Sequence, residues 1–298
     1  MPAIVSHYVL GEKVRKHLEK EYPDLITNRK AFAWGASGPD IFFSHRLMPL
    51  STKTSFSRLG SIMHNAPAND IINYLIVYAR KTHDDILMSY ALGFITHYAF
   101  DSIAHPYILY CSSQMSCQYA EKPVSLCHHE MEAALDSLYL RRETGMKVSD
   151  FRLQNAAPMD RAVNYPIACV LCGTLDGLYR IKTSRSELVK VQRDWHNALV
   201  LLDDRTHIKR SVVRIVEDAV GIRPILSPIF REDYPKLMPD YANVKHEMWF
   251  AEAEKKEHNE SFFELAEKAV KLSVELSAHV LSGKLLRSDQ CLASFSGH

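Results

Sequence analysis

Residues with metal-binding side chains recur at intervals of four in the segment Gly93–Pro106, and this spacing constrains the chain more than any other feature. On an α-helix, His97, Asp101 and His105 lie along one face over two turns. The residues between them are mostly apolar, so this helix is predicted to be buried. Burying two histidines and an aspartate on one stripe is costly unless they are paired or bound to a cation. The spacing therefore favours a metal site on a buried helix.

A second set of ligand-type residues follows at His128 and Glu132, again four positions apart. This spacing suits chelation of one ion, whereas His129 points away and is expected at the surface or in support of the ligands. A single such pair is more often an ion pair on a helix face. Two sets so close in the sequence, one of them in an apolar context, favour metal binding instead.

Helical periodicity dominates the rest of the chain, and no alternating strand pattern of useful length is present, so an all-α fold is expected. One helix should end before Tyr22-Pro23, residues 24–66 should be irregular, and Pro106 should end or kink the helix at His105. Ser184 and Ser261 have capping-box spacing. Further helices are predicted over 70–81, 85–105 and 124–142, and a long loop over 220–240.

The domain organisation expected from this pattern is a single all-α domain over residues 1–298. Within it we expect a metal-binding core over 1–140, a helical portion over 141–285 and a disordered tail over 286–298.

Composition excludes some classes of partner. The 298 residues carry a net charge of only +1, which gives no signal for nucleic acid or for an anionic membrane. The start of the chain lacks the pattern of a secretory signal, and no stretch is long and apolar enough to span a membrane. The six cysteines are then expected to be reduced, and the expected location is the cytoplasm.

The ordered set of motifs resembles the zinc-dependent phospholipase C family, whose fold is shared with fungal single-strand-specific nucleases. Residues 1 to about 135 carry the resemblance. Its parts are, in order, His7, Gly38-Pro39-Asp40, His64, His97-x3-Asp101, His105 and His128-x3-Glu132.

The resemblance implies a multi-helix phospholipase C/nuclease-like fold with two to three Zn²⁺ ions between helices, and hydrolysis of phosphate esters. One ion would take Asp40, His64, His97 and Asp101, and a second would take His105, His128 and Glu132. A third would use His7, a bridging Asp101, and the amine or carbonyl of Pro2 after removal of Met1. Asp40 would also be the catalytic general base.

The substrate implied by the resemblance is a phosphorylated small molecule or a lipid head group. Arg46 is a candidate phosphate contact, although a solvated loop charge is the more common role of such a residue. Tyr98 is predicted to be core, whereas three aromatic residues fit either the core or the wall of a cleft: Trp34, Phe42 and Phe43.

Two alternative functions remain open at this level. An HD-type phosphohydrolase would bind metal through His83 and Asp84, but this doublet has the polar setting of a capping turn. A non-catalytic helical protein could keep the zinc cluster for stability or for binding a phosphorylated ligand. Metal ligation by His128 and Glu132 would argue against the first alternative, and cleavage of a phosphodiester against the second.

Overall fold

The computed structural model describes residues 4–46, 55–118, 122–221, 227–233, 240–291 and 294–295. Most of these residues are helical, which confirms the predicted all-α class. The helices have the following bounds: α1 Ile4–Glu21, α2 Arg29–Ala36, α3 Ser57–His64, α4 Ala68–Thr82, α5 Asp85–Gln118, α6 Val124–Thr144, α7 Arg161–Tyr179, α8 Arg185–Leu202, α9 Ile208–Ala219 and α10 Phe262–Leu281. Short 3₁₀ turns are η1 Gly38–Phe42, η2 Val148–Asp150, η3 Leu153–Ala156, η4 Ser227–Ile229 and η5 Ser288–Gln290.

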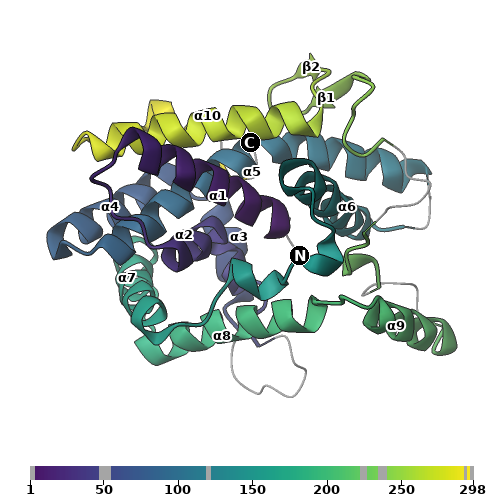
Figure 1. Ribbon diagram of the computed structural model, residues 1–298, viewed down its shortest axis with the longest axis horizontal. Coiled ribbons are helices and arrows are strands. Elements are labelled where there is room, and N and C mark those ends of the chain that lie inside the picture. Colours follow the sequence, from purple (N-terminus) through teal and green to yellow (C-terminus); the bar gives the residue numbers. More distant parts are fainter. Residues whose placement is uncertain are drawn as a thin grey trace.

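The long helix α5 forms the centre of the fold. It packs against α2, α4, α6 and α10, and α10 runs beside it along the upper edge of the view, opposite α8 (Figure 1). The prediction that the helix ends at His105 is wrong, because α5 continues through Pro106 to Gln118. Proline removes one backbone hydrogen bond, but Tyr107 and Ile108 beyond it are buried in the core, and their burial favours continuing the helix.

Helices α2 and α5 approach each other closely at two glycines, Gly35 and Gly93. A Cβ on Gly35 would lie 2.1 Å from the Tyr90 carbonyl oxygen, and one on Gly93 would lie 2.2 Å from that of Phe32. Both positions therefore exclude any side chain, and the two backbones approach directly. This contact fixes α2, and the η1 turn that follows it, against the helix that carries the stripe of ligand-type residues.

The expectation that residues 24–66 are irregular is wrong for α2, η1 and α3. Asn28 caps α2 by accepting a hydrogen bond from the Ala31 amide, so the start of this helix does have a recognisable cap. Every apolar residue of α2 is buried, which leaves no alternation of polar and apolar positions to reveal the helix. The helix α1 ends before Tyr22-Pro23, as predicted.

Two further elements differ from expectation near the end of the chain. Strands β1 Trp249–Ala251 and β2 Lys256–His258 form an antiparallel hairpin, which at three residues per strand is too short to show alternation. The tail was expected to be disordered, yet in its described part Leu286, Cys291 and Phe295 are buried. Their burial in the core compensates for the loss of conformational entropy.

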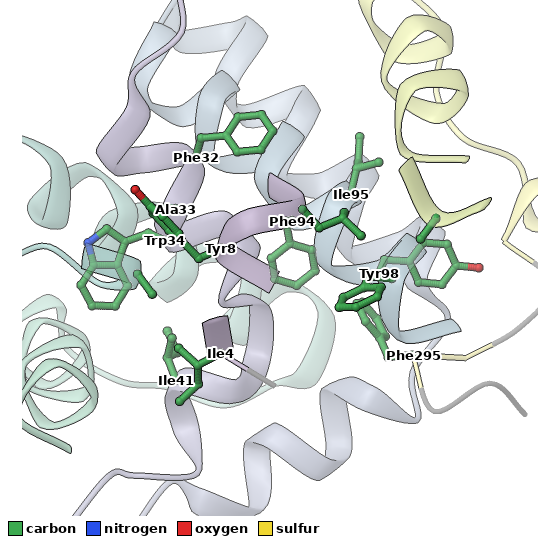
Figure 2. Close-up of a cluster of buried hydrophobic side chains, with 14 of the residues drawn as sticks. Ile4, Tyr8, Phe32, Ala33, Trp34, Ile41, Phe94, Ile95, Tyr98 and Phe295 are labelled. Carbon is green, nitrogen blue, oxygen red and sulfur yellow. The ribbon is translucent and has the colours of Figure 1, made fainter. Parts of the chain in front are cut away.

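One hydrophobic cluster joins the two ends of the described chain. Ile4 on α1 and Ile41 in η1 lie on one side, Phe94 and Tyr98 project from α5, and Phe295 packs against the last two (Figure 2). Residues far apart in the sequence thus share one core beside the ligand-type residues of α5. Within the described ranges, no helix is long and apolar enough to cross a membrane.

Candidate metal centre

The stripe predicted on α5 is present, and Asp101 lies at its middle. His97 is fully buried and Asp101 is 4% exposed. The His97 Nε2 atom lies 3.2 Å from Asp101 Oδ2, and His105 Nδ1 lies 3.8 Å from the same oxygen. The spacing of four therefore places the three side chains on one face, as expected from the helix period.

Two further side chains reach Asp101 from the segment before α4. The Asp40 Oδ1 atom lies 3.1 Å from His64 Nε2, which in turn lies 3.6 Å from Asp101 Oδ2. Gly38 makes this approach possible: its φ is +51°, and a Cβ there would lie 2.3 Å from the His97 ring. A glycine is thus required where the η1 turn passes over His97.

Helix α1 brings His7 to the other side of Asp101. The His7 Nε2 atom lies 2.9 Å from Asp101 Oδ1, and its ring stacks on His97 with 4.4 Å between centroids. We call Asp101 together with His7, Asp40, His64 and His97 the inner group. All five are buried, with exposed fractions of 7% or less.

The start of α1 is anchored by a residue that sequence reasoning missed. Asp136 on α6 accepts hydrogen bonds from the backbone amides of Val5 (3.1 Å) and Ser6 (2.7 Å). It also accepts one from Arg231 Nε at 2.6 Å. Asp136 and Arg231 are both buried, so the ion pair holds the free N–H groups of the α1 terminus next to His7. The available signal was that Asp136 lies one turn beyond Glu132 on an otherwise apolar face.

A second cluster, which we call the outer group, consists of His105, His128 and Glu132. The Glu132 Oε1 atom lies 3.1 Å from His128 Nε2 and 4.0 Å from His105 Nε2. Glu132 is buried, whereas both histidines are partly exposed. The His129 Nδ1 atom lies 3.5 Å from the other oxygen of Glu132, Oε2, which agrees with its expected place beside the ligands.

The geometry of these clusters suits metal ions. Ligand atoms lie within 4.8 Å of one another in three sets, and their members are His7, His97 and Asp101; Asp40, His64 and His97; and His105, His128 and Glu132. Imidazole and carboxylate are the ligand types that zinc accepts in catalytic sites. The structure thus brings together all eight residues that the sequence suggested as ligands, whereas Pro2 lies outside the described residues.

Three of the histidines have one ring nitrogen held by a backbone carbonyl. Nδ1 contacts Gly60 O in His64 (2.6 Å), Ala36 O in His97 (3.0 Å) and Phe295 O in His105 (3.1 Å). A carbonyl can only accept, so Nδ1 must carry the proton in each ring. The Nε2 atom is then the nitrogen that faces the carboxylates and is available to a metal.

In the absence of a cation, protons balance the buried carboxylates. Burial favours neutral imidazoles, but nearby carboxylates outweigh it and raise the pKa of His64 to about 10 and that of His105 to about 9. Burial likewise opposes ionisation of Asp101, yet the surrounding imidazoles lower its pKa well below the usual value. The pKa of Glu132 is also well below its usual value, because His128 and His105 outweigh burial.

Two buried atoms support the fit to a cation. His7 Nδ1 has no hydrogen-bond partner among the described residues, and His97 Nε2 makes no hydrogen bond of good geometry although it lies 3.2 Å from Asp101 Oδ2. Both atoms are inaccessible to solvent. Buried polar atoms without partners are rare and call for an explanation such as an ion. Together with the donor set of imidazoles and carboxylates, they show that these residues fit zinc.

Arg46 does not have the role of a solvated charge. Its guanidinium contacts Glu187 on α8, and its backbone amide donates to Asp194 Oδ2 at 3.2 Å. Arg46 is therefore tied to α8, and these contacts keep its side chain from acting as a mobile phosphate contact.

The aromatic candidates divide between core and site. Tyr98 is buried, as predicted, and Trp34 and Phe42 are fully buried as well. The indole nitrogen of Trp34 donates to the Pro158 carbonyl at 2.9 Å. Phe43 is only partly buried and stacks on His64 at 5.5 Å, so it is the aromatic residue placed to flank the inner group.

The His83-Asp84 doublet forms the turn between α4 and α5. His83 has a φ of +50° at the end of α4, and Asp84 Oδ1 accepts from the Ile86 amide at 2.9 Å. Neither residue belongs to a set of candidate ligands among the described residues. The capping role suggested by the sequence is confirmed, and the HD-type alternative has no support here.

Comparison with known proteins gives one match. Residues 6–166 match the sequence profile of a family described as zinc dependent phospholipase C. No curated protein and no solved structure matches the chain. The matched span contains the inner and outer groups entirely, whereas Arg231 and Phe295 lie beyond it.

Proposed function

The chain belongs to the zinc-dependent phospholipase C family, and we propose that it is a zinc-dependent phosphoesterase acting on a phosphodiester or a phosphomonoester. The observation that carries this proposal is the position of Asp101. Four buried side chains, from α1, η1, α3 and α5 itself, converge on or beside its two oxygens. A fold that needed only stability would gain more from apolar residues at these positions.

We assign one ion to Asp40, His64, His97 and Asp101, and a second to His105, His128 and Glu132. A third ion would use His7 together with Asp101, whose two oxygens face different histidines. The proposed content is therefore two to three zinc ions. The outer assignment matches one set of ligand atoms that lie close together, and the other two draw on the sets Asp40, His64, His97 and His7, His97, Asp101, which share His97.

Different residues of the protein are assigned different roles in the proposed reaction. Zinc, when bound, supplies a Lewis acid for phosphoryl oxygens and makes a nearby water acidic enough to react at neutral pH. Asp40, a buried carboxylate at the edge of the inner group, is the proposed general base as well as a ligand. The carbonyls of Gly60 and Ala36 hold the His64 and His97 rings in one orientation, so the ligands need little reorganisation.

The proposed substrate carries an anionic phosphoryl group, as a phosphorylated small molecule or a lipid head group does. A cluster of cations and imidazoles attracts such a group electrostatically. Phe43, stacked on His64, would contact the part of the substrate next to the phosphorus.

The test is metal analysis followed by a phosphoester screen. Purified protein is expected to hold two to three zinc ions and to cleave a generic phosphodiester or phosphomonoester, with activity lost on chelation and restored by zinc. Asp40→Asn should retain most of the bound metal but lose activity. Less than one ion per chain after zinc is supplied would refute the metal centre. Full metal without any cleavage would favour the non-catalytic alternative.

A further inference from the structure

The three oriented histidines obtain their carbonyl acceptors from very different parts of the chain. Gly60 is four residues before His64 on α3, and Ala36 ends the helix packed against α5. The acceptor for His105 is Phe295, which lies 190 positions away in the sequence. The first two acceptors fall inside the family-matched span 6–166, and Phe295 falls outside it. One histidine of the outer group is thus oriented by a segment that the family match does not cover.

The position of this carbonyl depends on the ring of the same residue. Phe295 is completely buried. Its ring centroid lies 5.2 Å from that of Tyr98 and 5.8 Å from that of Phe94, both on α5. Figure 2 shows the Phe295 ring beside these two side chains. The same centroid lies 5.7 Å from that of His64 and 5.9 Å from that of His97. Aromatic rings packed edge to face at these separations attract one another, so the ring anchors residue 295 against the inner group.

The orientation of the His105 ring matters because each of its two nitrogens lies near a different carboxylate. Its Nδ1 atom lies 3.8 Å from Asp101 and its Nε2 atom lies 4.0 Å from Glu132. With the Phe295 carbonyl accepting from Nδ1, that nitrogen carries the proton and Nε2 is directed to the outer group. Without the carbonyl, the same ring could flip or change tautomer and offer Nδ1 to Asp101.

We propose that Phe295 is a positioning residue of the metal centre, anchored through its ring and acting through its backbone carbonyl on His105. This inference rests on the proposed function, since it assumes that the outer group binds zinc. Loss of a hydrogen-bond partner of a metal-ligating histidine typically lowers metal affinity by about 10- to 100-fold. We expect a loss of this size at the outer group and little change at the inner group.

The experiment compares zinc affinities, measured by chelator competition, in the full-length chain and its variants. Phe295→Ala keeps a carbonyl but removes the anchor, and it should weaken the outer ion by about 10- to 100-fold. Phe295→Leu keeps an apolar anchor and should stay close to the unmodified protein. Phe151→Ala removes another buried phenylalanine, whose ring packs on Tyr8 of α1, and should leave the affinity of the outer ion unchanged even if it lowers the melting temperature.

A double-mutant cycle decides whether Phe295 acts through His105. In a His105→Ala background the carbonyl has no imidazole to orient, so adding Phe295→Ala should cause no further loss of affinity. An equal loss in both backgrounds, or no loss in either, would overturn the proposal, as would a Phe295→Ala protein that no longer folds by circular dichroism. A protein that binds no zinc before any substitution would instead refute the proposed function itself.

Discussion

The inner and outer groups contain the same types of ligand but are supported differently. The inner group is buried on all sides, and two of its histidines are oriented by carbonyls from α2 and α3, which pack directly against its surroundings. In the outer group both histidines are partly exposed, and His105 depends on Phe295 for its acceptor. From this contrast we expect substitutions to change the geometry of the outer group more easily than that of the inner group.

The largest effect is expected for Asp101→Asn, because Asp101 contacts histidines of both groups. Its two oxygens face His7 and His97, and His105 lies nearby. We expect loss of metal from the inner group and of activity, by more than the roughly 100-fold typical of removing a supporting hydrogen bond. The melting temperature of the zinc-loaded protein should also fall, because metal binding stabilises the fold. Elemental analysis with calorimetry measures both, and full metal content with unchanged melting would contradict the central role of Asp101.

The next largest effect is expected for Asp136→Ala. Asp136 lies on α6, the helix that also carries His128 and Glu132 of the outer group. Asp136 holds the start of α1 from α6 and pairs with the buried Arg231. Its removal deprives Arg231 Nε and two backbone amides of the Asp136 carboxylate and leaves a buried guanidinium without its counter-charge, which should lower the free energy of unfolding by about 3–5 kcal/mol. Chemical denaturation of zinc-free protein measures this change.

The matched control for this variant is Asp160→Ala, which removes the cap of α7 and an ion pair with Lys30, both near the surface, and should lower the free energy of unfolding much less. An Asp136→Ala protein no less stable than this control would show that the α1 terminus needs no anchor.

A smaller and more local effect is expected for His128→Ala. His128 is partly exposed and contacts Glu132 and the His105 ring of the outer group. The variant should lose the outer ion while the inner ion remains, with a change of about 1 kcal/mol in zinc-free stability. Zinc stoichiometry by elemental analysis distinguishes the outcomes. Simultaneous loss of all metal would mean that the two groups form one inseparable site.

The pH dependence of the stability of the zinc-free protein should also distinguish the inner group from the outer group. The pKa of His105 is about 9 and that of His64 about 10 in the folded state, against about 6.5 in an unfolded chain. Protonation of both rings therefore stabilises the fold fully below about pH 6.5, and this contribution is lost as the pH rises through 9 at the outer group and 10 at the inner group. Thermal unfolding in chelator should show falling stability from neutral to alkaline pH, while zinc-loaded protein should show a smaller fall.

The opposite result would also be informative. Zinc displaces protons from these rings, so its uptake at pH 7 should release protons, measurable by calorimetry in buffers with different ionisation enthalpies. Zinc-free protein whose stability does not fall above pH 7 would mean that the imidazoles are already neutral there.

Much of the site was predictable because it rests on local spacing. The intervals of four on α5 and α6 follow from the helix period, which is why His97, Asp101 and His105 could be placed on one face in advance. The all-α class and the end of α1 followed from periodicity and from Tyr22-Pro23.

The missed features depend on contacts between distant segments. Nothing near Asp136 in the sequence indicates Arg231 or the α1 amides, and nothing near Phe295 indicates His105. Continuation of α5 through Pro106 likewise reflects burial in the assembled core, which outweighed a local rule. Contacts made by tertiary packing do not recur at a regular interval in the sequence, so they cannot be predicted from residue spacing as the helix period can.

The glycine contact between α2 and α5 bears on how this chain could change over evolutionary time. Most core positions can exchange side chains if a neighbour repacks, but Gly35 and Gly93 meet backbone atoms, which have no alternative rotamer. Any substitution there would move α2 as a whole and carry the Gly38–Asp40 turn away from His97. Drift in the surrounding sequence can therefore alter the walls of the site, and with them the molecules it admits, while the distance between loop and helix stays the same.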